Sequence, residues 1–404
     1  MEESAQDINK KKKVLFLIHT LQIGGAERVL VDLVNNLPAN KYDITLMTVV
    51  DVGILKRQLK PHIKYESIFS FKALKKLSGG TKKYEASTNA TSKKNIPKEL
   101  FIKAYTSFWK HANLKKLYEK HIKEKYDIEV SFLEGIPAKI IANSTNPNSK
   151  KMCWIHIDLI NEPKSDKFFK NVKEQKKIYN KFDKIICVSE EVKNQLIKKL
   201  HIKEDKLKIV YNPIDAENIL KKSKEKTIKK DNKKLTFCSV GRLAKQKGYD
   251  RLIDVCSQLE KEKYNFEVWI VGTGPELKNL EDKIREKGVT SIKLLGYHPN
   301  PYPYIKSADW FLCSSRAEGF STVVAEAIIL EKAIISTNCS GAEEMLGKNS
   351  EYGIVCENSE DGIYESMKKI LNCKELSKHY ETVIKHQQKL FILEKSINDI
   401  EKAL

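Results

Sequence analysis

With 404 residues, of which 41% are hydrophobic and 31% charged, the chain has the composition of a folded protein, which excludes an intrinsically disordered one. The length exceeds one ordinary α/β core and predicts two domains with a cleft between them. Met1 is followed by acidic and polar residues, and the first apolar run, 14–18, is too short to span a bilayer. We therefore expect no signal peptide and a cytoplasmic location.

The net charge of +20 is distributed unevenly. Residues 1–200 carry a net +17 and residues 201–404 a net +3, while residues 235–404 taken alone carry −2. A general lysine bias would affect both halves alike. The basic first half instead predicts attraction to an anionic partner, which is a membrane surface, a diphosphate-bearing acceptor or nucleic acid.

The eight cysteines have no paired spacing, and several lie in apolar runs, so we expect buried, reduced thiols rather than disulfides or a zinc site. They are Cys153, Cys187, Cys238, Cys256, Cys313, Cys339, Cys356 and Cys373.

Apolar strand patterns alternate with helical patterns from the start of the chain, which predicts a parallel sheet covered by helices. A helix is expected over 27–37, and the strands of this first series are expected over 13–18, 44–49, 128–133, 152–157 and 184–188. Residues 70–95 are polar and rich in Gly, Ser and Thr, so we expect a mobile loop there. Apolar residues recur near helical spacing over 101–118, which favours a core-facing amphipathic helix over one lying in a membrane surface.

A second alternating series begins at Leu235. Its strands are expected over 235–240, 268–271, 292–295, 310–313 and 333–336. The lysine-rich, polar stretch from Lys221 to Lys234 separates the two series and reads as a linker. We therefore predict the first domain over 1–215, a linker over 216–234, the second domain over 235–373 and C-terminal helices over 374–404.

In the first domain, Gly24 and Gly25 lie between a strand and a helix, where glycines let backbone N–H groups approach a phosphate. No third glycine completes the Gly-x-Gly-x-x-Gly pattern of a dinucleotide site. His156 ends a predicted strand, at the sheet edge where α/β proteins bind ligands. A functional and a structural role for His156 both remain open.

In the second domain, Arg242 and Lys247 flank a strand-to-helix turn, where a guanidinium and an ammonium suit a diphosphate. Further on, Glu318 precedes the turn formed by Gly319, Phe320 and Ser321. Eight residues after Glu318, Glu326 lies in an apolar helical segment, where a carboxylate is costly unless it has a polar partner such as sugar hydroxyls.

These residues together resemble glycosyltransferase family 4, the large retaining family with the GT-B fold. The resemblance is carried by Gly24 to Arg28, Val210 to Asp215, Val240 to Leu243 with Lys247 and Gly248, and the pair Glu318 and Glu326. It implies two Rossmann-like domains facing each other across a cleft, with the C-terminal helix packing back on the first domain. It also implies a hexosyltransferase that moves a sugar from a nucleotide-sugar, with uracil as the expected base.

The residue roles come from the same resemblance. Arg242 and Lys247 hold the donor diphosphate, Glu326 the ribose hydroxyls, and Glu318 the transferred sugar with the nearby amides of Gly319 and Phe320. Ser321 belongs to this donor site, Gly25 approaches the phosphates from the first domain, and His156 lies beside the reacting sugar. Glu318, His156, Arg242 and Lys247 are thus the expected catalytic residues, with no cofactor and no metal.

The resemblance further implies synthesis of capsule, exopolysaccharide or lipopolysaccharide on a glycan or lipid-diphosphate-linked acceptor, at the inner face of the cell membrane. One alternative is a nucleotide-sugar epimerase or sugar phosphorylase of the same fold, although neither accounts as well for all four site residues. The other is a basic nucleic-acid-binding protein, but the sequence has no clustered basic and aromatic recognition motif. We expect no nucleic-acid partner.

Overall fold

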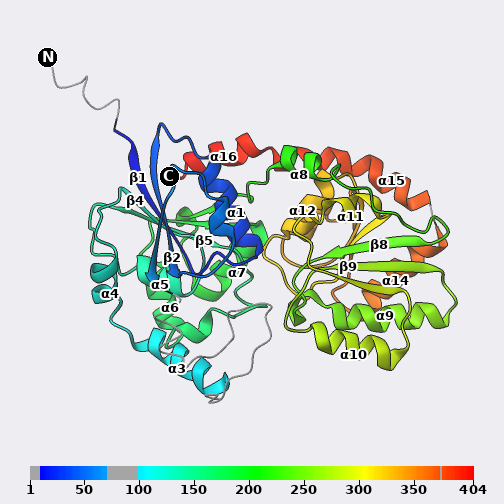
Figure 1. Cartoon of the computed structure of the whole chain (residues 1–404). Helices are drawn as coiled ribbons and strands as arrows, with labels where there is room; N and C mark the ends of the chain where they lie inside the picture. The colour runs from blue at the N-terminus through cyan, green and yellow to red at the C-terminus, as the bar shows by residue number, and fades with distance from the viewer. Residues whose placement is uncertain (1–9, 71–97, 374) are drawn as a thin grey trace. The chain divides into compact units, whose positions relative to one another are not determined.

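The computed structural model describes residues 10–70, 98–373 and 375–404 (Figure 1). The described chain forms two compact units. Unit 1 contains the described residues up to Val188 together with Lys193–Val210 and Ile397–Leu404. Unit 2 contains Ser189–Val192 and the described residues of Tyr211–Ser396.

In the described part of unit 1, seven parallel strands form one sheet in the order β3-β2-β1-β4-β5-β6-β7. The strands are β1 Lys12–Ile18, β2 Tyr42–Val50, β3 Lys64–Phe69, β4 Ile128–Ser131, β5 Lys150–Ile155, β6 Lys184–Cys187 and β7 Leu207–Ile209. After two leading lysines each, β1 and β5 are apolar and buried on both faces, as central parallel strands covered by helices require. β4 is also fully buried, although two of its four residues, Glu129 and Ser131, are polar. The sheet therefore forms the core of the unit.

Helices connect these strands and cover the sheet (Figure 1). They are α1 Gly25–Asn36, α3 Lys98–His111, α4 Leu114–His121, α5 Ile136–Ile141, α6 Val172–Tyr179 and α7 Glu190–Leu200, with short 3-10 turns at Leu55–Gln58, Asp166–Phe168 and Glu204–Lys206. The buried residues of α1 fall at helical spacing, which explains why this segment folds as an amphipathic helix against the sheet.

In unit 2, the described strands form a parallel sheet in the order β10-β9-β8-β11-β12-β13. They are β8 Leu235–Val240, β9 Phe266–Val271, β10 Ile292–Gly296, β11 Trp310–Cys313, β12 Ala333–Thr337 and β13 Ile354–Cys356. The helices are α8 Ala216–Lys222, α9 Tyr249–Lys261, α10 Leu277–Lys287, α11 Tyr302–Ser307, α12 Thr322–Ile329, α13 Ala342–Leu346, α14 Glu360–Asn372 and α15 Glu375–Val383, with 3-10 turns at Lys245–Lys247 (η4) and Ile384–Phe391 (η5).

The C-terminal helix α16, Leu393–Glu401, returns the chain to unit 1. Lys41 Nζ donates a hydrogen bond to Glu401 Oε1, and Lys208 Nζ donates one to the Asp399 carbonyl, each at 3.0 Å. Lys150 Nζ donates to the Ala403 carbonyl at 2.5 Å. The expectation of a C-terminal helix packing on the first domain is therefore confirmed. The return is shorter than the predicted 374–404, because α15 and η5 belong to unit 2.

The observed divisions differ from the predicted ones in further respects. The chain passes from unit 1 to unit 2 after Val210 rather than after 215, and the predicted linker 216–234 includes α8. The predicted helix over 101–118 is two helices, α3 and α4. The predicted loop 70–95 lies outside the described residues except for Ser70.

The predicted strands are all present, each within a few residues of its expected bounds. All eight cysteines are free and seven are buried, as expected, but Cys373 is exposed. Among the helices of the described residues, none combines the length and the apolarity needed to cross a membrane.

Each sheet has one point where the order of its strands reverses direction along the chain. In unit 1 this switch point lies between β1 and β4, and in unit 2 between β8 and β11. Loops that leave the carboxyl ends of two such strands run to opposite faces of the sheet and open a crevice, where α/β proteins bind ligands. The switch points therefore locate the candidate site residues.

Candidate active site

At the switch point of unit 2, Lys247 and Glu318 form an ion pair. Lys247 ends the 3-10 turn η4 that follows β8, and Glu318 lies in the loop after β11. The Lys247 Nζ atom is 2.6 Å from Glu318 Oε1, although 71 positions separate the two residues in the sequence. Two predicted site residues are thus brought into direct contact by strand order.

The pair is charged and only partly exposed. Burial alone would lower the pKa of Lys247, but the nearby Glu318 carboxylate raises it above its usual range. The Ser315 hydroxyl also donates to Glu318 Oε1, at 2.6 Å. Both contacts use the same oxygen, and Glu318 Oε2 has no hydrogen-bond partner among the described residues. The carboxylate therefore retains the capacity to accept a hydrogen bond from a hydroxyl group.

Two arginines hold the loops that carry this pair. Arg251 is buried and its Nη2 atom donates to the Ser314 and Ser315 carbonyls, at 2.8 Å each. Arg316 forms a bidentate pair with Asp250, at 2.6 and 2.9 Å. Such planar two-bond contacts fix geometry as well as charge. The loops after β8 and β11 are therefore held together by contacts other than the Lys247–Glu318 pair itself.

Glycines allow this close approach. Gly248 has a left-handed backbone (φ +67°), and a Cβ atom there would lie 2.1 Å from the Ser314 carbonyl oxygen. A Cβ atom on Gly241 would lie 3.2 Å from Lys247 Cε, so the lysine stem lies across this glycine. Arg242, the next residue, is exposed and forms no ion pair within the described chain. Its guanidinium is available to an anion.

The loop after β11 leads into α12. Ser321 is its N-cap residue, and the Ser321 hydroxyl is buried without a hydrogen-bond partner among the described residues. Phe320 is buried and stacks on Tyr211, with ring centroids 5.2 Å apart, while the Gly319 carbonyl accepts from the Ser189 hydroxyl at 3.0 Å. The loop conformation is thus fixed, and the helix N-terminus attracts anions.

Glu326 is the fifth residue of α12 and only 4% exposed. The sequence predicts that this carboxylate requires a polar partner, and the structure supplies one, because the Tyr302 hydroxyl donates to Glu326 Oε1 at 3.3 Å. The partner comes from α11 rather than from α12 itself. Glu326 is therefore a buried acid with a protein partner.

Unit 1 places different chemistry at its switch point. Gly25 begins α1, directly after the loop that follows β1, and no side chain caps this helix. A Cβ atom on Gly24 would lie 2.1 Å from Glu27 Oε2, so a carboxylate of the first turn lies against this glycine. Negative charge at a helix N-terminus is stabilising. The turn thus has the geometry expected of an anion site, with an acidic side chain already beside it.

His156 follows β5 and is held in an apolar setting. Its ring lies against Phe132, with centroids 4.8 Å apart, and its Nε2 atom is buried without a hydrogen-bond partner among the described residues. Burial lowers the pKa of His156 to about 3, so the imidazole is neutral near pH 7. It can exchange hydrogen bonds with a hydroxyl but cannot supply positive charge.

Two further residues of this region were not predicted from the sequence. Glu134 follows β4, and its Oε2 atom accepts from the backbone N–H of His156 at 3.2 Å; burial raises the pKa of this carboxyl. His19 follows β1, lies 3.4 Å from the Tyr105 hydroxyl, and has a pKa lowered by burial to about 4. A polar residue within three positions of the end of a strand is the only sequence signal for either.

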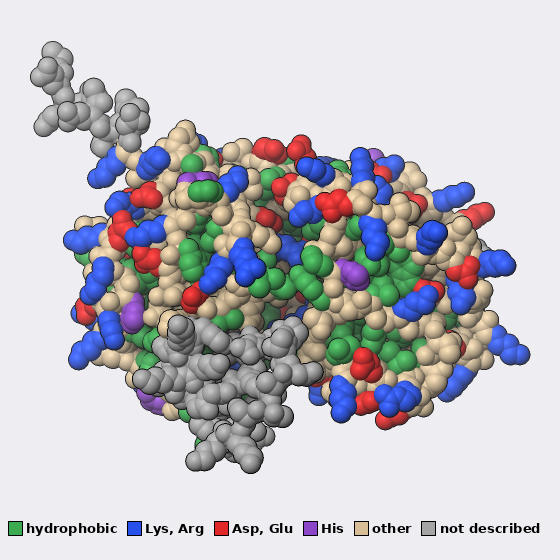
Figure 2. Space-filling view, in the orientation of Figure 1, with side chains coloured by type: hydrophobic (Ala, Val, Ile, Leu, Met, Phe, Trp, Pro, Cys, Tyr) green, Lys and Arg blue, Asp and Glu red, His purple; other side chains and the backbone are tan. Residues whose placement is uncertain are grey.

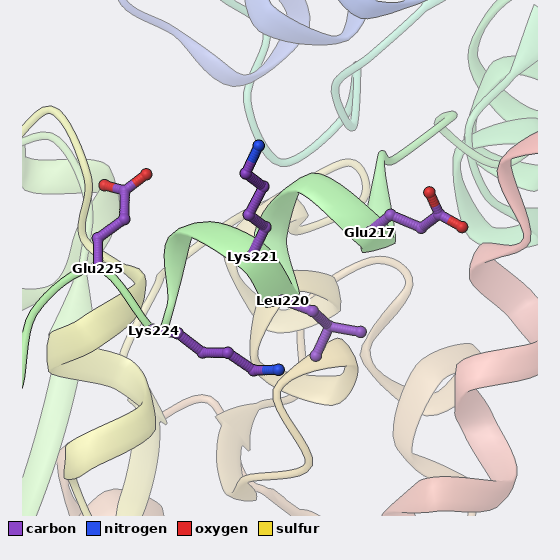
Figure 3. Close-up of a pocket in the computed structure, with 5 residues that line it drawn as sticks. All are labelled: Glu217, Leu220, Lys221, Lys224 and Glu225. Atoms are coloured by element: carbon purple, nitrogen blue, oxygen red, sulfur yellow. The ribbon is translucent and has the colours of Figure 1, made fainter.

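Other features do not form a site for this chemistry. The hollow beside α8, of about 550 Å³, is lined by side chains that point in different directions and do not converge (Figure 3). Within the described ranges, no group of three or more His, Cys, Asp or Glu residues is placed to hold a metal ion. That the reaction needs no metal and no cofactor stays a prediction.

Comparisons with known proteins match both halves of the chain. The family model described as Glycosyltransferase Family 4 matches residues 23–218, and that described as Glycosyl transferases group 1 matches residues 221–387.

Two curated relatives illustrate the match. The N-acetylgalactosamine-N,N'-diacetylbacillosaminyl-diphospho-undecaprenol 4-alpha-N-acetylgalactosaminyltransferase of Campylobacter jejuni is 33% identical over 230 residues, which are 56% of this chain and 61% of the relative. CapM of Staphylococcus aureus, a capsular polysaccharide biosynthesis glycosyltransferase, is 28% identical over 203 residues, 48% of this chain and 53% of the relative. The chain therefore spans between about half and three fifths of the length of these relatives.

Solved structures resemble the whole chain. Anabaena HepE, crystallised in complex with UDP and glucose, has a TM-score of 0.71 at 17% identity, over 97% of this chain and 99% of that one. S. aureus TarM has a TM-score of 0.68 at 14% identity, over 97% and 98%. At these identities the likeness concerns the fold.

The chain folds into two α/β units with parallel sheets, and it matches both glycosyltransferase models. These two findings define a protein of the GT-B class. The chain belongs to glycosyltransferase family 4.

Proposed function

We propose that this protein is a retaining glycosyltransferase that transfers a hexose from a UDP-sugar to a glycan or lipid-diphosphate-linked saccharide during cell-surface polysaccharide synthesis. The Campylobacter jejuni relative is named for a diphospho-undecaprenol-linked acceptor, CapM for capsule synthesis, and HepE was crystallised with UDP. The observation that carries the proposal is the Lys247–Glu318 pair at the switch point between β8 and β11. It places an ammonium and a hydrogen-bond acceptor where an α/β unit binds nucleotides.

In this proposal, the donor diphosphate is bound by Lys247, Arg242 and the N-terminus of α12 with the Ser321 hydroxyl. An ammonium has three N–H donors, so Lys247 can keep its contact with Glu318 and still bond a phosphate oxygen. The diphosphate gains negative charge as the sugar leaves, and preorganised cations stabilise that charge in the transition state. Binding and catalysis are thus joined in one group of residues.

Glu318 receives the sugar and Glu326 the ribose. The Glu318 Oε2 atom lacks a partner within the described residues, which supports a contact with a hydroxyl of the transferred hexose. Glu326 lies deeper and already accepts from Tyr302, so its proposed contact with the ribose hydroxyls affects binding more than turnover. The Gly319 and Phe320 amides are proposed to lie near the sugar.

The transfer step retains the anomeric configuration. The acceptor hydroxyl attacks the anomeric carbon on the face that the diphosphate leaves; the bond from that carbon to the diphosphate oxygen breaks, and the bond to the acceptor oxygen forms. The hydroxyl proton passes to a diphosphate oxygen, so no strong protein base is needed. His156, neutral near pH 7, is proposed to orient a hydroxyl of the reacting sugar, and Gly25 to contact a phosphate through its amide.

The location is proposed to be cytoplasmic, at the inner face of the cell membrane. Residues 1–200 carry a net +17, which favours contact with anionic lipid. On the face drawn in Figure 2, Lys and Arg side chains are scattered with Asp and Glu between them, rather than forming one band. Cosedimentation with vesicles tests this part: equal binding to neutral and anionic vesicles would contradict it.

A panel of UDP-sugars tests the activity itself. Each sugar is incubated with the protein and a lipid-diphosphate-linked saccharide, UDP release is measured, and the anomeric configuration of the product is read from NMR coupling constants. We expect UDP release with one donor and an axial or equatorial linkage identical to that of the donor. Inversion would contradict the proposed mechanism, and interconversion of the donor without acceptor would favour an epimerase.

A further inference from the structure

A second basic feature lies in unit 1, away from its switch point. A hollow of about 350 Å³ is bounded by the end of α3, the first turn of α4, and helices α5 and α6. In Figure 1 these helices lie on one side of the sheet, and α5 packs on both α4 and α6. Six lysines line the hollow: Lys110, Lys115, Lys139, Lys170, Lys177 and Lys181.

The lining contains little negative charge to balance these lysines. Among its described residues, Glu174 is the single acidic side chain, and both of its oxygens are occupied. Oε1 lies 3.2 Å from Lys139 Nζ, and Oε2 accepts from the Lys170 backbone N–H at 2.5 Å. Lys139 is buried and also donates to the Trp109 and Phe168 carbonyls, at 2.9 Å each. Glu174 and Lys139 therefore form the floor of the hollow and satisfy each other.

The other lysines add positive charge around Lys139. Lys110, Lys115, Lys170 and Lys177 have no ion-pair partner within the described residues. Burial lowers the pKa of Lys139; the Glu174 carboxylate opposes this shift, and the charges of Lys170 and Lys110 add to it. An anion among these side chains would offset that positive charge, because opposite charges at hydrogen-bond distance attract.

The first turn of α4 adds backbone donors to this surface. Asn113 caps the helix, and its side chain accepts from the Lys116 N–H at 3.1 Å. Leu114 and Lys115, the first two residues of the helix, line the hollow. Their N–H groups precede the first intrahelical hydrogen bond, and the positive end of the helix dipole favours an anion there.

We propose that this hollow is a binding site for a phosphate group, with Lys110, Lys115, Lys170 and Lys177 and the first turn of α4 as its ligands. None of these residues belongs to the proposed donor site, so the inference goes beyond the transfer reaction and does not depend on it. The phosphate has two possible sources, a lipid headgroup or a soluble phosphate. Phe108 on α3 is an apolar side chain that is 48% exposed, so lipid vesicles are tested beside free phosphate.

The experiment compares the full chain with two double variants of equal charge change. Lys170→Glu with Lys177→Glu alters the hollow, and Lys198→Glu with Lys203→Glu alters exposed lysines elsewhere in unit 1. Binding of inorganic phosphate is measured by calorimetry, and binding to vesicles of phosphatidylcholine with or without phosphatidylglycerol by cosedimentation. Lys110→Ala with Lys115→Ala provides a second variant of the hollow that adds no negative charge. Thermal unfolding confirms that all three double variants fold.

We expect the hollow variants to bind at least one of the two anionic probes about tenfold more weakly than wild type, and the Lys198/Lys203 variant to bind both within about twofold. A loss confined to phosphatidylglycerol vesicles identifies a lipid headgroup, and a loss confined to inorganic phosphate identifies a soluble anion. If the hollow variants and the control bind both probes alike, the proposal is overturned. These measurements do not involve sugar transfer, so neither result bears on the proposed transfer reaction, which the UDP-sugar panel tests separately.

Discussion

The switch points of the two units differ in the charge they hold. In unit 2, the Lys247 ammonium and the Glu318 carboxylate lie 2.6 Å apart. The exposed guanidinium of Arg242 follows β8, the strand that also precedes Lys247. In unit 1, His19 and His156 have pKa values lowered by burial, and burial raises the pKa of Glu134, so this point favours neutral groups. The same architecture thus offers a charged site, suited to a diphosphate, and, around His19, Glu134 and His156, a buried region suited to hydroxyl groups.

The largest effect is expected from removing the cation of unit 2. Lys247→Ala leaves Glu318 without its ion-pair partner and removes a donor from the leaving diphosphate, so turnover should fall about 100- to 1000-fold. Lys245→Ala, two positions earlier and exposed, is the matched control and should stay within about twofold of wild type. Initial rates of UDP release measure both, and equal rates in the two variants would show that the pair is not catalytic.

The two acids of unit 2 should separate in their kinetic effects. Glu318→Gln should lower kcat. Glu326→Gln should raise the KM for the UDP-sugar about tenfold with little change in kcat, because it removes a hydrogen bond to a charged group, which contributes about 1.5–3 kcal/mol. Glu365→Gln, exposed in the same unit, is the control. An unchanged KM in Glu326→Gln would show that Glu326 does not bind the ribose.

The close approach of the loops in unit 2 can be tested through stability. Gly248→Ala introduces a Cβ atom 2.1 Å from the Ser314 carbonyl at φ +67°, whereas Gly288→Ala has almost the same φ, +64°, and no atom within 4 Å. The second change should cost about 1 kcal/mol and the first at least about 2 kcal/mol more. Urea unfolding gives both values, and equal losses would mean that the loops can separate without cost.

The neutral site of unit 1 predicts a pH dependence. The pKa of His156 is about 3 in the folded protein and near the ordinary 6.5 in the unfolded chain, so between these values the unfolded state binds an additional proton. The free energy of unfolding therefore falls as pH decreases from about 6.5. His156→Gln should reduce this slope by about 1 kcal/mol per pH unit between pH 6 and 4.5.

Exposed His62→Gln serves as the control for that pH series. Its unfolding profile should run parallel to that of wild type across the whole range. A His156→Gln profile that also runs parallel would show that the imidazole is solvated, and the contrast between the two switch points would then disappear.

The sequence predicted the central strands because most of their residues are apolar, as in 14–18 and 235–240. It did not predict β3, β7 or β13, each of which lies at a sheet edge. β3 and β7 carry mixed polarity, and β13 is apolar but only three residues long. Edge strands need less apolar sequence, since only part of their surface is covered.

The candidate residues of unit 2 were found from motifs, but their contacts were not. That Lys247 meets Glu318 depends on β8 and β11 being neighbours in the sheet, which no local pattern reveals. His19 and Glu134 were missed for a related reason, because a lone polar residue after a strand gains its meaning from the adjacent strands β1, β4 and β5. Long-range pairing, rather than propensity, supplied this part of the site.

Hydrogen–deuterium exchange with and without UDP shows whether the switch point between β8 and β11 binds the nucleotide diphosphate. If it does, segments 241–248 and 318–326 exchange more slowly when UDP is present, and α10 is unchanged as an internal reference from the same unit. Slower exchange confined to other segments, or none at a UDP concentration that saturates binding, would contradict binding at this switch point.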